Sequence, residues 1–237
     1  MTEAARQLLR RIVLLVVVMS AGVASSTGYC AAATAATMHT AALPVVGCPT
    51  EFGVSGPSPR TPATVTVSSS SPTRGLVAYT NTQMYLIGPQ GMRCSGIVAA
   101  DGGSGVIAWP QGQRSPGPHS HTAGLKLSLE PACASCRAED ACPFFTALAR
   151  DLGFPCASGV PPGEHVYRLR SNIILFEDPP RVAGSGWPSG GPDPANGLVG
   201  YTGSPENGLV YRSTCTLPAS DHSICTTSLN DVIRRYG

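Results

Sequence analysis

The chain has 237 residues, of which 42% are hydrophobic and 13% are charged, and its formal net charge is +2. This length is enough for a domain with a substantial buried core. The chain contains a single lysine, Lys126, so it lacks the dense positive charge that displaces counterions from nucleic-acid phosphates. The composition therefore argues for a globular protein and excludes nucleic acid as a partner.

The N-terminal segment has the pattern of a secretory signal peptide. Three arginines precede an apolar run over residues 12–24, and small residues follow it. A run of about 13 residues is too short to cross the ~30 Å hydrocarbon core of a bilayer comfortably. We expect residues 1–33 to be a signal peptide, cleaved after Ala24 or after Ala33, with no stable membrane span left afterwards. The alternative is an uncleaved signal anchor that tethers the protein to the membrane.

The rest of the chain is expected to form one domain after a short leader. Residues 34–47 are rich in alanine and threonine without a clear period, which predicts a flexible leader. Residues 48–237 then form a single disulfide-rich secreted domain. Removal of residues 1–33, which carry three arginines and one glutamate, leaves 13 basic and 13 acidic residues, so polyanions remain poor partners.

Short strands dominate the expected domain. The sequence LKLSLE at 125–130 alternates apolar and polar residues strictly, and IILF at 173–176 is apolar throughout, as in a strand buried on both faces. Short runs of this kind between Gly/Pro turns indicate antiparallel β-structure. Strands are expected, in chain order, at 64–67, 76–80, 84–88, 94–100, 106–110, 125–130, 165–170 and 173–177, followed by a closing pair at 197–201 and 208–212.

Two helices are expected among these strands. Segment 143–152 begins with a proline, repeats apolar residues at helical spacing and ends before Gly153. Segment 228–236 also has helical spacing, and Ser228 and Asp231 could form a capping box at its start. These elements predict an α+β fold, mostly antiparallel β with a sandwich- or barrel-like sheet and two short helices, stabilised by disulfides.

Nine cysteines are present, and Cys30 lies in or beside the segment lost with the signal peptide. The eight that remain are an even number in an exported chain, which indicates four structural disulfides. We expect a Cys215–Cys225 bridge, because these residues flank a short segment, and a Cys48–Cys94 bridge as a second expectation. The other four then pair among themselves: Cys133, Cys136, Cys142 and Cys156.

The alternatives for those four cysteines are zinc binding and thiol–disulfide exchange. Four thiolates could bind zinc, but the second pair lacks the usual close spacing, and exported proteins seldom keep free thiols for zinc. The sequence CASC at 133–136 has the C-x-x-C form of thiol–disulfide exchange sites, but no strand–helix–strand pattern surrounds it. We therefore expect structural disulfides, with no metal site and no cofactor.

The segment 179–197 is the candidate binding loop. Ten of its 19 residues are glycine or proline, and a long loop without regular structure often carries a binding surface. We predict binding residues at Asp178, Trp187, Asp193 and Asn196, although no calcium-loop spacing supports a metal among their oxygens. The favoured alternative is that Trp187 fills the core, because a tryptophan is costly to leave in water.

No complete catalytic set is evident. Asp221, His222 and Ser223 include the residue types of a hydrolase triad, but neighbouring residues cannot form a relay among themselves. We predict no catalytic residue. The alternative function is a secreted hydrolase that uses His222 or Asp221 with a carboxylate such as Glu177 or Asp178.

Several short motifs occur in a distinctive order from Gly47 onwards. They are CP at 48, IGPQGMRCSGIVAADGGSG at 87–105, CASC and ACPFF, FEDPPRVAGSGWPSGG at 176–191, PANGLVGY at 194–201, and TCTLP with a following HSIC. In this order the chain resembles a group of uncharacterised secreted proteins of high-GC Gram-positive bacteria. The resemblance implies export but no activity, and Met92 stands where a tryptophan is expected.

Export and composition together predict a binding role. We expect a secreted or cell-surface protein that is not an enzyme and that binds a ligand of the cell envelope. The sequence does not name that ligand or any other partner.

Overall fold

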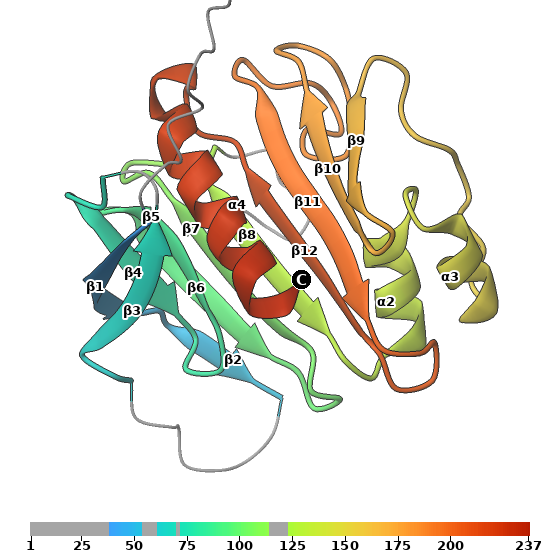
Figure 1. Cartoon of the computed structure of the whole chain (residues 1–237), viewed down its shortest axis with the longest axis horizontal. Coiled ribbons are helices and arrows are strands. Elements are labelled where there is room, and N and C mark those ends of the chain that lie inside the picture. Colours follow the sequence, from blue (N-terminus) through green and yellow to red (C-terminus); the bar gives the residue numbers. More distant parts are fainter. Residues whose placement is uncertain (1–37, 54–60, 70–71, 114–122) are drawn as a thin grey trace, which may run out of the picture. The chain divides into compact units, whose positions relative to one another are not determined.

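The structure is a computed structural model that describes residues 38–53, 61–69, 72–113 and 123–237 (Figure 1). The expected signal peptide and Cys30 lie outside the described residues. Among the residues that are described, no helix has both the length and the apolar character needed to cross a bilayer.

The described strands form two sheets. The four-stranded sheet has the order β3-β1-β4-β5, with β1 at His39–Gly47, β3 at Thr64–Ser69, β4 at Leu76–Thr80 and β5 at Tyr85–Pro89. The eight-stranded sheet has the order β2-β6-β7-β8-β12-β11-β10-β9, with β2 at Thr50–Phe52, β6 at Arg93–Val98, β7 at Ser104–Trp109, β8 at Leu125–Glu130, β9 at His165–Arg170, β10 at Ile173–Asp178, β11 at Ala195–Thr202 and β12 at Leu209–Cys215. Neighbours are antiparallel except for the β1/β4 and β2/β6 pairs.

The predicted fold class is confirmed: antiparallel strands dominate, the helices are few and short, and four disulfides are present. Strands β4, β8 and β9 have the predicted bounds. The expected closing pair is also present, because β11 and β12 are antiparallel neighbours. The alternating pattern of β8 was informative because this strand buries most of one face, whereas β9 was recognised although all six of its residues are exposed.

The expected leader at 34–47 is wrong for residues 39–47, which form β1. This strand pairs antiparallel with β3 and parallel with β4, and it buries Leu43, which is 2% exposed. Most of its side chains remain exposed or half-buried, so the segment lacks the alternation by which a strand is recognised. Tertiary pairing, rather than local pattern, makes it a strand.

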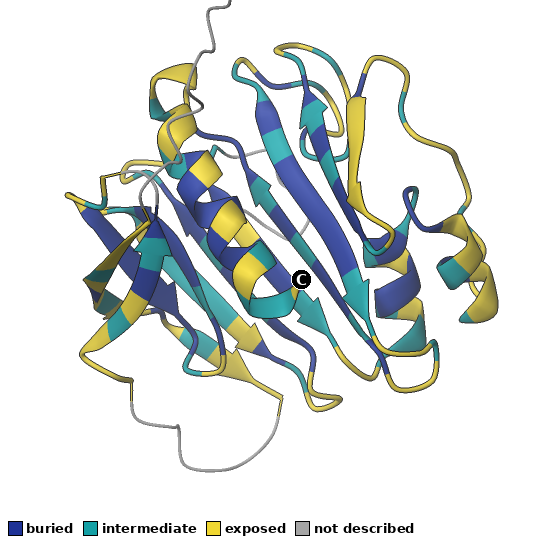
Figure 2. Ribbon diagram, in the orientation of Figure 1, coloured by how far each residue is buried: buried dark blue, intermediate teal, exposed yellow. Residues whose placement is uncertain are grey.

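The main hydrophobic core lies between the small sheet, the large sheet and α4 at His222–Tyr236. Tyr79 of β4 and Leu86 of β5 meet Leu127 of β8 and Tyr211 of β12 in this core. Figure 2 shows buried residues along one side of α4 and exposed residues along the other, as expected for an amphipathic helix on a sheet. The arrangement is sandwich-like, with layers on the face of an open sheet.

Helix α4 begins six residues earlier than predicted, after the short 3-10 turn η1 at Ala219–Asp221. Ser228 is therefore buried in mid-helix, and the predicted capping box with Asp231 is wrong. Cys225, which is 1% exposed, extends the apolar face back towards the N-terminus. The sequence pattern underestimated this helix because the buried side of its first two turns includes a cysteine and a threonine rather than large apolar residues.

The opposite face of the large sheet carries α2 at Ala134–Ala141, and α3 at Thr146–Asp151 packs against α2 (Figure 1). The prediction of one helix over 143–152 is thus wrong in its start, and α2 was not predicted at all. Phe144 and Phe145 lie between the two helices and pack into a second core cluster with Phe176. Because both rings are buried against the sheet, residues 143–145 do not join the helix that the spacing of apolar residues predicted.

The four disulfides are Cys48–Cys94, Cys133–Cys136, Cys142–Cys156 and Cys215–Cys225. Both expected bridges are present, and the other four cysteines pair among themselves as predicted. Their sulfurs are therefore occupied, and the alternative of a four-thiolate zinc site is wrong for this structure. On the chain-entropy model the 46-residue separation of Cys48–Cys94 stabilises the fold by about 4 kcal/mol and the short Cys133–Cys136 bridge by about 2 kcal/mol.

A buried amide connects the two sheets. Asn81 is 0% exposed and follows β4, and the two hydrogens of its Nδ2 are shared among three acceptors at 2.7–3.1 Å: the carbonyl oxygen of Ile97, Oγ of Ser104 and the carbonyl oxygen of Gly105. Its Oδ1 accepts from the N–H of Met84 at 3.0 Å. Because both the donor and the acceptor group of this amide are hydrogen-bonded, the side chain fixes the β4–β5 turn against β6 and β7.

Candidate functional site

The candidate binding loop folds around its own tryptophan. Trp187 is 2% exposed, and its carbonyl oxygen accepts hydrogen bonds from the N–H groups of Gly184 and Gly190, both at 2.9 Å. A Cβ at Gly191 would lie 2.3 Å from the indole ring, so only glycine allows the chain to pass this close. The alternative that Trp187 fills the core is therefore the one observed.

Asp178 is the last residue of β10, and its carboxylate binds backbone N–H groups of this loop. Its Oδ2 accepts from the N–H of Gly186 at 2.7 Å and from that of Trp187 at 2.8 Å, and the side chain is 0% exposed. Burial raises the pKa of Asp178, and the backbone N–H groups oppose the rise. The carboxylate thus serves as an internal anchor for the loop, which is a structural role.

A second carboxylate, that of Glu164, binds the same loop at Ser185, the residue before Gly186. Its Oε2 accepts from the N–H of Ser185 at 3.0 Å and from Oγ of Ser185 at 2.9 Å. Burial also raises the pKa of Glu164, and hydrogen bonds from Ser185 oppose the rise. The guanidinium of Arg212 donates to the carbonyl oxygen of Ser185 at 2.8 Å and lies 5.6 Å from the ring centroid of Phe176.

The predicted binding residues are therefore not brought together on a surface. Asp178 and Trp187 face the interior, so they are not available to a ligand in this structure, while Asp193 and Asn196 are half-buried. Glu164 and Arg212 were not predicted, because they come from segments far apart in the sequence and only the fold brings them to the loop. The loop is packed around Trp187 and held by the carboxylates of Asp178 and Glu164.

The structure does not assemble the hydrolase alternative. His222 is exposed at the start of α4, whereas Asp178 is buried on β10, a strand that is not among those on which α4 mainly packs. Glu177 points to the opposite face of β10 from Asp178, as neighbours in a strand do. Among the described residues, no hydrogen bond joins Asp221 or the ring of His222 to either carboxylate.

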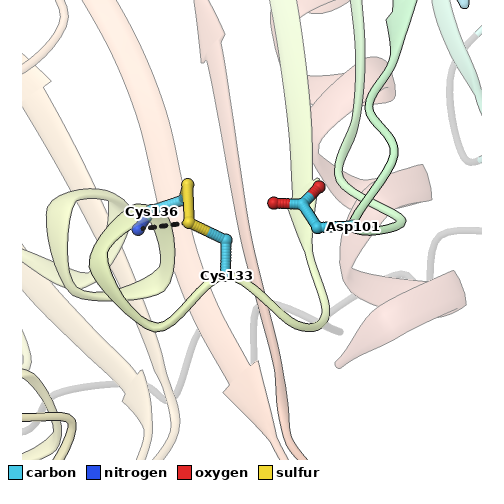
Figure 3. Close-up of side chains that lie close together, drawn as sticks. All are labelled: Asp101, Cys133 and Cys136. Carbon is cyan, nitrogen blue, oxygen red and sulfur yellow. Dashed lines mark hydrogen bonds between the residues drawn. A yellow bond between two sulfur atoms is a disulfide. The ribbon is translucent and has the colours of Figure 1, made fainter. Parts of the chain in front are cut away.

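A different cluster forms where the β6–β7 turn meets the start of α2. The Sγ atoms of Cys133 and Cys136 and a carboxylate oxygen of Asp101 lie within 4.8 Å of one another. Figure 3 shows the Asp101 carboxylate directed towards the disulfide. Both cysteines are half-buried, and Asp101 is exposed. The C-x-x-C spacing was visible in the sequence, but the approach of Asp101 was not.

Further acids surround this cluster. Glu130 at the end of β8 and Asp101 flank Gly103, where an added Cβ would lie 2.7 Å from Oε2 of Glu130 and 3.2 Å from Oδ1 of Asp101. Burial, together with the charges of Asp140 and Asp101, raises the pKa of Glu130 to about 7. Asp140 accepts a hydrogen bond from Oγ of Ser128 at 2.6 Å. The turn is thus locally anionic.

An open pocket of about 360 Å³ lies along α2. Ser135, which stands between the two cysteines, lines it together with Phe154 and the Cys142–Cys156 bridge. Phe154 is 48% exposed, so the pocket has an apolar rim that is open to solvent. A pocket of this size and character fits a side chain or a short segment of a partner.

Exposed apolar side chains concentrate after α3. Of the nine large apolar residues that are exposed among the described residues, five lie within 154–169, here called the 154–169 surface: Phe154, Val160, Val166, Tyr167 and Leu169. The last three belong to β9, the edge strand of the large sheet, in which all six residues are exposed. Figure 2 shows this strand exposed beside the mostly buried β10 and β11.

Comparisons with models of protein families and with curated proteins find no match. Function is therefore inferred from the residues and their geometry.

Proposed function

We propose that the chain is an exported protein that acts by binding, at the cell surface or outside the cell, and that β9 recognises an extended segment of another polypeptide. The observation that carries the proposal is the exposure of β9: all six of its residues are exposed, although it belongs to the same sheet as the buried β10. Its partner would be a component of the cell envelope or its surroundings.

The backbone of β9 supports this mode of binding. The strand lies at the end of the strand order and has β10 as its only neighbour among the described strands. An edge strand leaves one row of N–H and C=O groups unpaired, and an extended peptide can add to it as a further strand. Tyr167 and Leu169, which are 56% and 50% exposed, would then contact alternate side chains of the added strand.

Charge favours an acidic partner. Strand β9 carries Arg168 and Arg170 together with His165, and it contains no acidic residue. Complementary charge guides association and penalises wrong partners more than it adds raw affinity. We therefore expect the preferred segment to alternate apolar residues with carboxylates.

Export is supported by the cysteines. Four disulfides in a chain of this size fit an oxidising compartment, where such bridges persist. The basic and apolar N-terminal pattern and the resemblance to secreted proteins of high-GC Gram-positive bacteria agree with this location. The four disulfides also suit a protein that must remain folded without cytosolic chaperones.

The test uses two short synthetic peptides, one alternating glutamate with valine and one alternating lysine with valine. Binding is measured by titration, and amide hydrogen exchange locates it. We expect the glutamate peptide to bind at least about tenfold more tightly, since a like-charge contact costs more than 1.4 kcal/mol. It should protect β9 amides from exchange.

The variant Tyr167→Ser/Leu169→Ser should abolish this binding. The matched control Phe52→Ser/Ile97→Ser removes two apolar side chains that are 37% and 51% exposed at the other end of the same sheet, and it should bind normally. Equal binding of both peptides, or equal loss in both variants, would contradict recognition by β9.

A further inference from the structure

We propose that the Cys133–Cys136 disulfide is an exchange site that accepts two electrons from a pair of cysteine thiols in an exported polypeptide. The proposal goes beyond binding at β9 and does not depend on it. It rests on the position of this bridge at the start of α2, on the half-buried state of both cysteines, and on a pocket along α2 that is lined by Ser135, which stands between the two cysteines in the sequence.

The Cys133–Cys136 bridge differs from the others in what it contributes to the fold. It joins residues only three positions apart, whereas the other bridges span 10, 14 and 46 positions. A bridge that closes so short a loop restricts the unfolded chain least. Unlike the almost fully buried Cys215 and Cys225, both of its cysteines are half-buried residues.

Two of the bridges lie at opposite ends of helix α2. Cys133 is the N-cap residue, and its Sγ accepts a hydrogen bond from the N–H of Cys136 at 3.1 Å. The N-terminus of a helix stabilises a thiolate, both through such N–H groups and through the helix dipole. Cys142 is the C-cap residue of the same helix, where the dipole disfavours a thiolate. The half-buried Cys142–Cys156 bridge is therefore an internal control.

The charge of Asp101 destabilises a thiolate at this site and so opposes the effect of the helix N-terminus. Its carboxylate oxygen lies within 4.8 Å of both sulfurs, so its charge disfavours a thiolate on either cysteine and repels an incoming thiolate. We expect the helix to make the bridge exchangeable and the carboxylate to limit how readily it is reduced. Other charged groups in this region are Arg137, which follows Cys136 on α2, and Glu130 with the charges that act on it, Asp140, Lys126 and Glu139.

The pocket along α2 supplies a place for the partner. Ser135 lines it and belongs to the C-x-x-C turn itself, and Phe154 and Pro155 form an apolar wall. A polypeptide that inserts an apolar side chain there would bring neighbouring residues beside the Cys133–Cys136 bridge. The substrate class is thus an exported polypeptide with a reduced cysteine pair close to an apolar residue.

The exchange balances without any further reactant. A thiolate of the partner attacks Sγ of Cys133, the Cys133–Cys136 bond breaks, and Cys136 leaves as a thiolate that takes a proton from water. The second thiolate of the partner attacks the sulfur of its own mixed disulfide, a disulfide forms in the partner, and Cys133 is released as a thiolate. The partner loses two electrons and two protons, and the Cys133–Cys136 pair gains two electrons.

The first test equilibrates the mature protein in buffers with different ratios of reduced to oxidised dithiothreitol, followed by alkylation and peptide mass mapping. We expect Cys133–Cys136 to be reduced at a ratio at least about tenfold lower than Cys142–Cys156, while the fold remains intact by circular dichroism. Reduction of the two bridges together, or of Cys142–Cys156 first, would overturn the proposal. A small dithiol does not require the 154–169 surface, so failure here is distinct from failure of peptide binding.

The second test measures the rate of reduction in an Asp101→Asn variant. Loss of the charge should accelerate reduction of Cys133–Cys136 by dithiothreitol at least about threefold, and added salt should reduce the difference between variant and wild type. Asp221→Asn, which removes an acid of η1 at the start of α4, is the control and should leave the rate unchanged. An unchanged rate in Asp101→Asn would contradict the assigned role of Asp101.

The third test uses a reduced peptide with two cysteines next to a phenylalanine. The wild-type protein should oxidise up to one equivalent of this peptide, and Cys133→Ser/Cys136→Ser should oxidise none while its melting temperature falls by no more than about 8 °C. If the double variant oxidises the peptide as well as the wild type, another bridge is responsible and the proposal fails. Should that variant not fold, the site-resolved reduction of the wild-type protein still decides the matter.

Discussion

Arg235 on α4 donates from Nη2 to the carbonyl oxygen of Tyr85 on β5 at 2.8 Å, and its guanidinium lies 3.9 Å from the centroid of the Tyr85 ring. The same guanidinium binds Oδ2 of Asp231 through Nε at 2.8 Å. The side chain of Asp231 is only 4% exposed, so this arginine both compensates a buried charge and connects the last helix to the small sheet.

We predict that Arg235→Ala lowers the free energy of unfolding by about 2–3 kcal/mol, because it leaves the carboxylate of Asp231 buried without its best partner. Arg234→Ala is the matched control: Arg234 is 34% exposed and its contact with Asp231 is 3.5 Å long, so the loss should stay below about 1 kcal/mol. Urea denaturation of both variants measures the difference. Similar losses would contradict a specific role for Arg235.

Glu130 predicts a pH dependence of stability. Its pKa is raised from 4.5 to about 7 in the folded protein, so the unfolded chain binds fewer protons than the folded one between these values. Stability therefore falls as pH rises from about 4.5 to about 7. Because Glu130 is partly exposed, solvent screening reduces the expected effect to about 1–2 kcal/mol.

The variant Glu130→Gln removes this titration. It should be more stable than the wild type by about 1–2 kcal/mol at pH 8 and equally stable at pH 4, as measured by urea denaturation at both values. A stabilisation that is the same at both pH values would show that the effect is not due to ionisation of Glu130.

The buried tryptophan of the 179–197 loop predicts a large loss of stability on truncation. Trp187→Ala should lower the free energy of unfolding by about 3–5 kcal/mol, because it leaves a cavity where the ring packs against Gly191. Ser189→Ala changes an exposed residue of the same loop and should alter stability by less than about 0.5 kcal/mol. A loss below about 1 kcal/mol for Trp187→Ala would instead favour a ligand-binding role for this residue.

The hydrogen bonds of Asn81 between the two sheets predict that its substitution lowers the stability of the fold. Asn81→Asp removes the hydrogen bonds donated by Nδ2 and places a carboxylate against three acceptor oxygens, so stability should fall by about 3 kcal/mol or more. Asn207→Asp, at an exposed turn, is the control and should change stability by less than about 0.5 kcal/mol. Thermal unfolding at pH 7 compares the two variants, and equal effects would contradict the role given to Asn81.

Local pattern was sufficient where a strand or bridge depends on nearby residues. The alternation of LKLSLE predicted β8 with the bounds that are observed, and the short spacing of Cys215 and Cys225 predicted their bridge. Pattern failed where tertiary contacts decide. Strand β1 has no alternation because most of its side chains are exposed, and α2 was concealed because its first turn contains cysteines rather than large apolar residues.

The candidate sites depended even more on long-range contacts. The sequence pointed to Trp187 but could not show that Asp178 and Glu164 bind consecutive N–H groups beneath it. It also displayed the C-x-x-C pair at 133–136 without the approach of Asp101, which comes from a turn 32 positions before Cys133. Residues that meet from separate elements leave no periodic signal, so their encounter had to come from the fold.

The most direct test of the whole account is a count of free thiols in the protein secreted by its own host, by alkylation and intact mass measurement before and after complete reduction. We predict cleavage after Ala24 or Ala33, eight bridged cysteines, and no alkylation before reduction, apart from Cys30 if cleavage follows Ala24. Four or more reactive thiols before reduction, or an uncleaved N-terminus on a cytosolic protein, would contradict an exported, disulfide-stabilised fold.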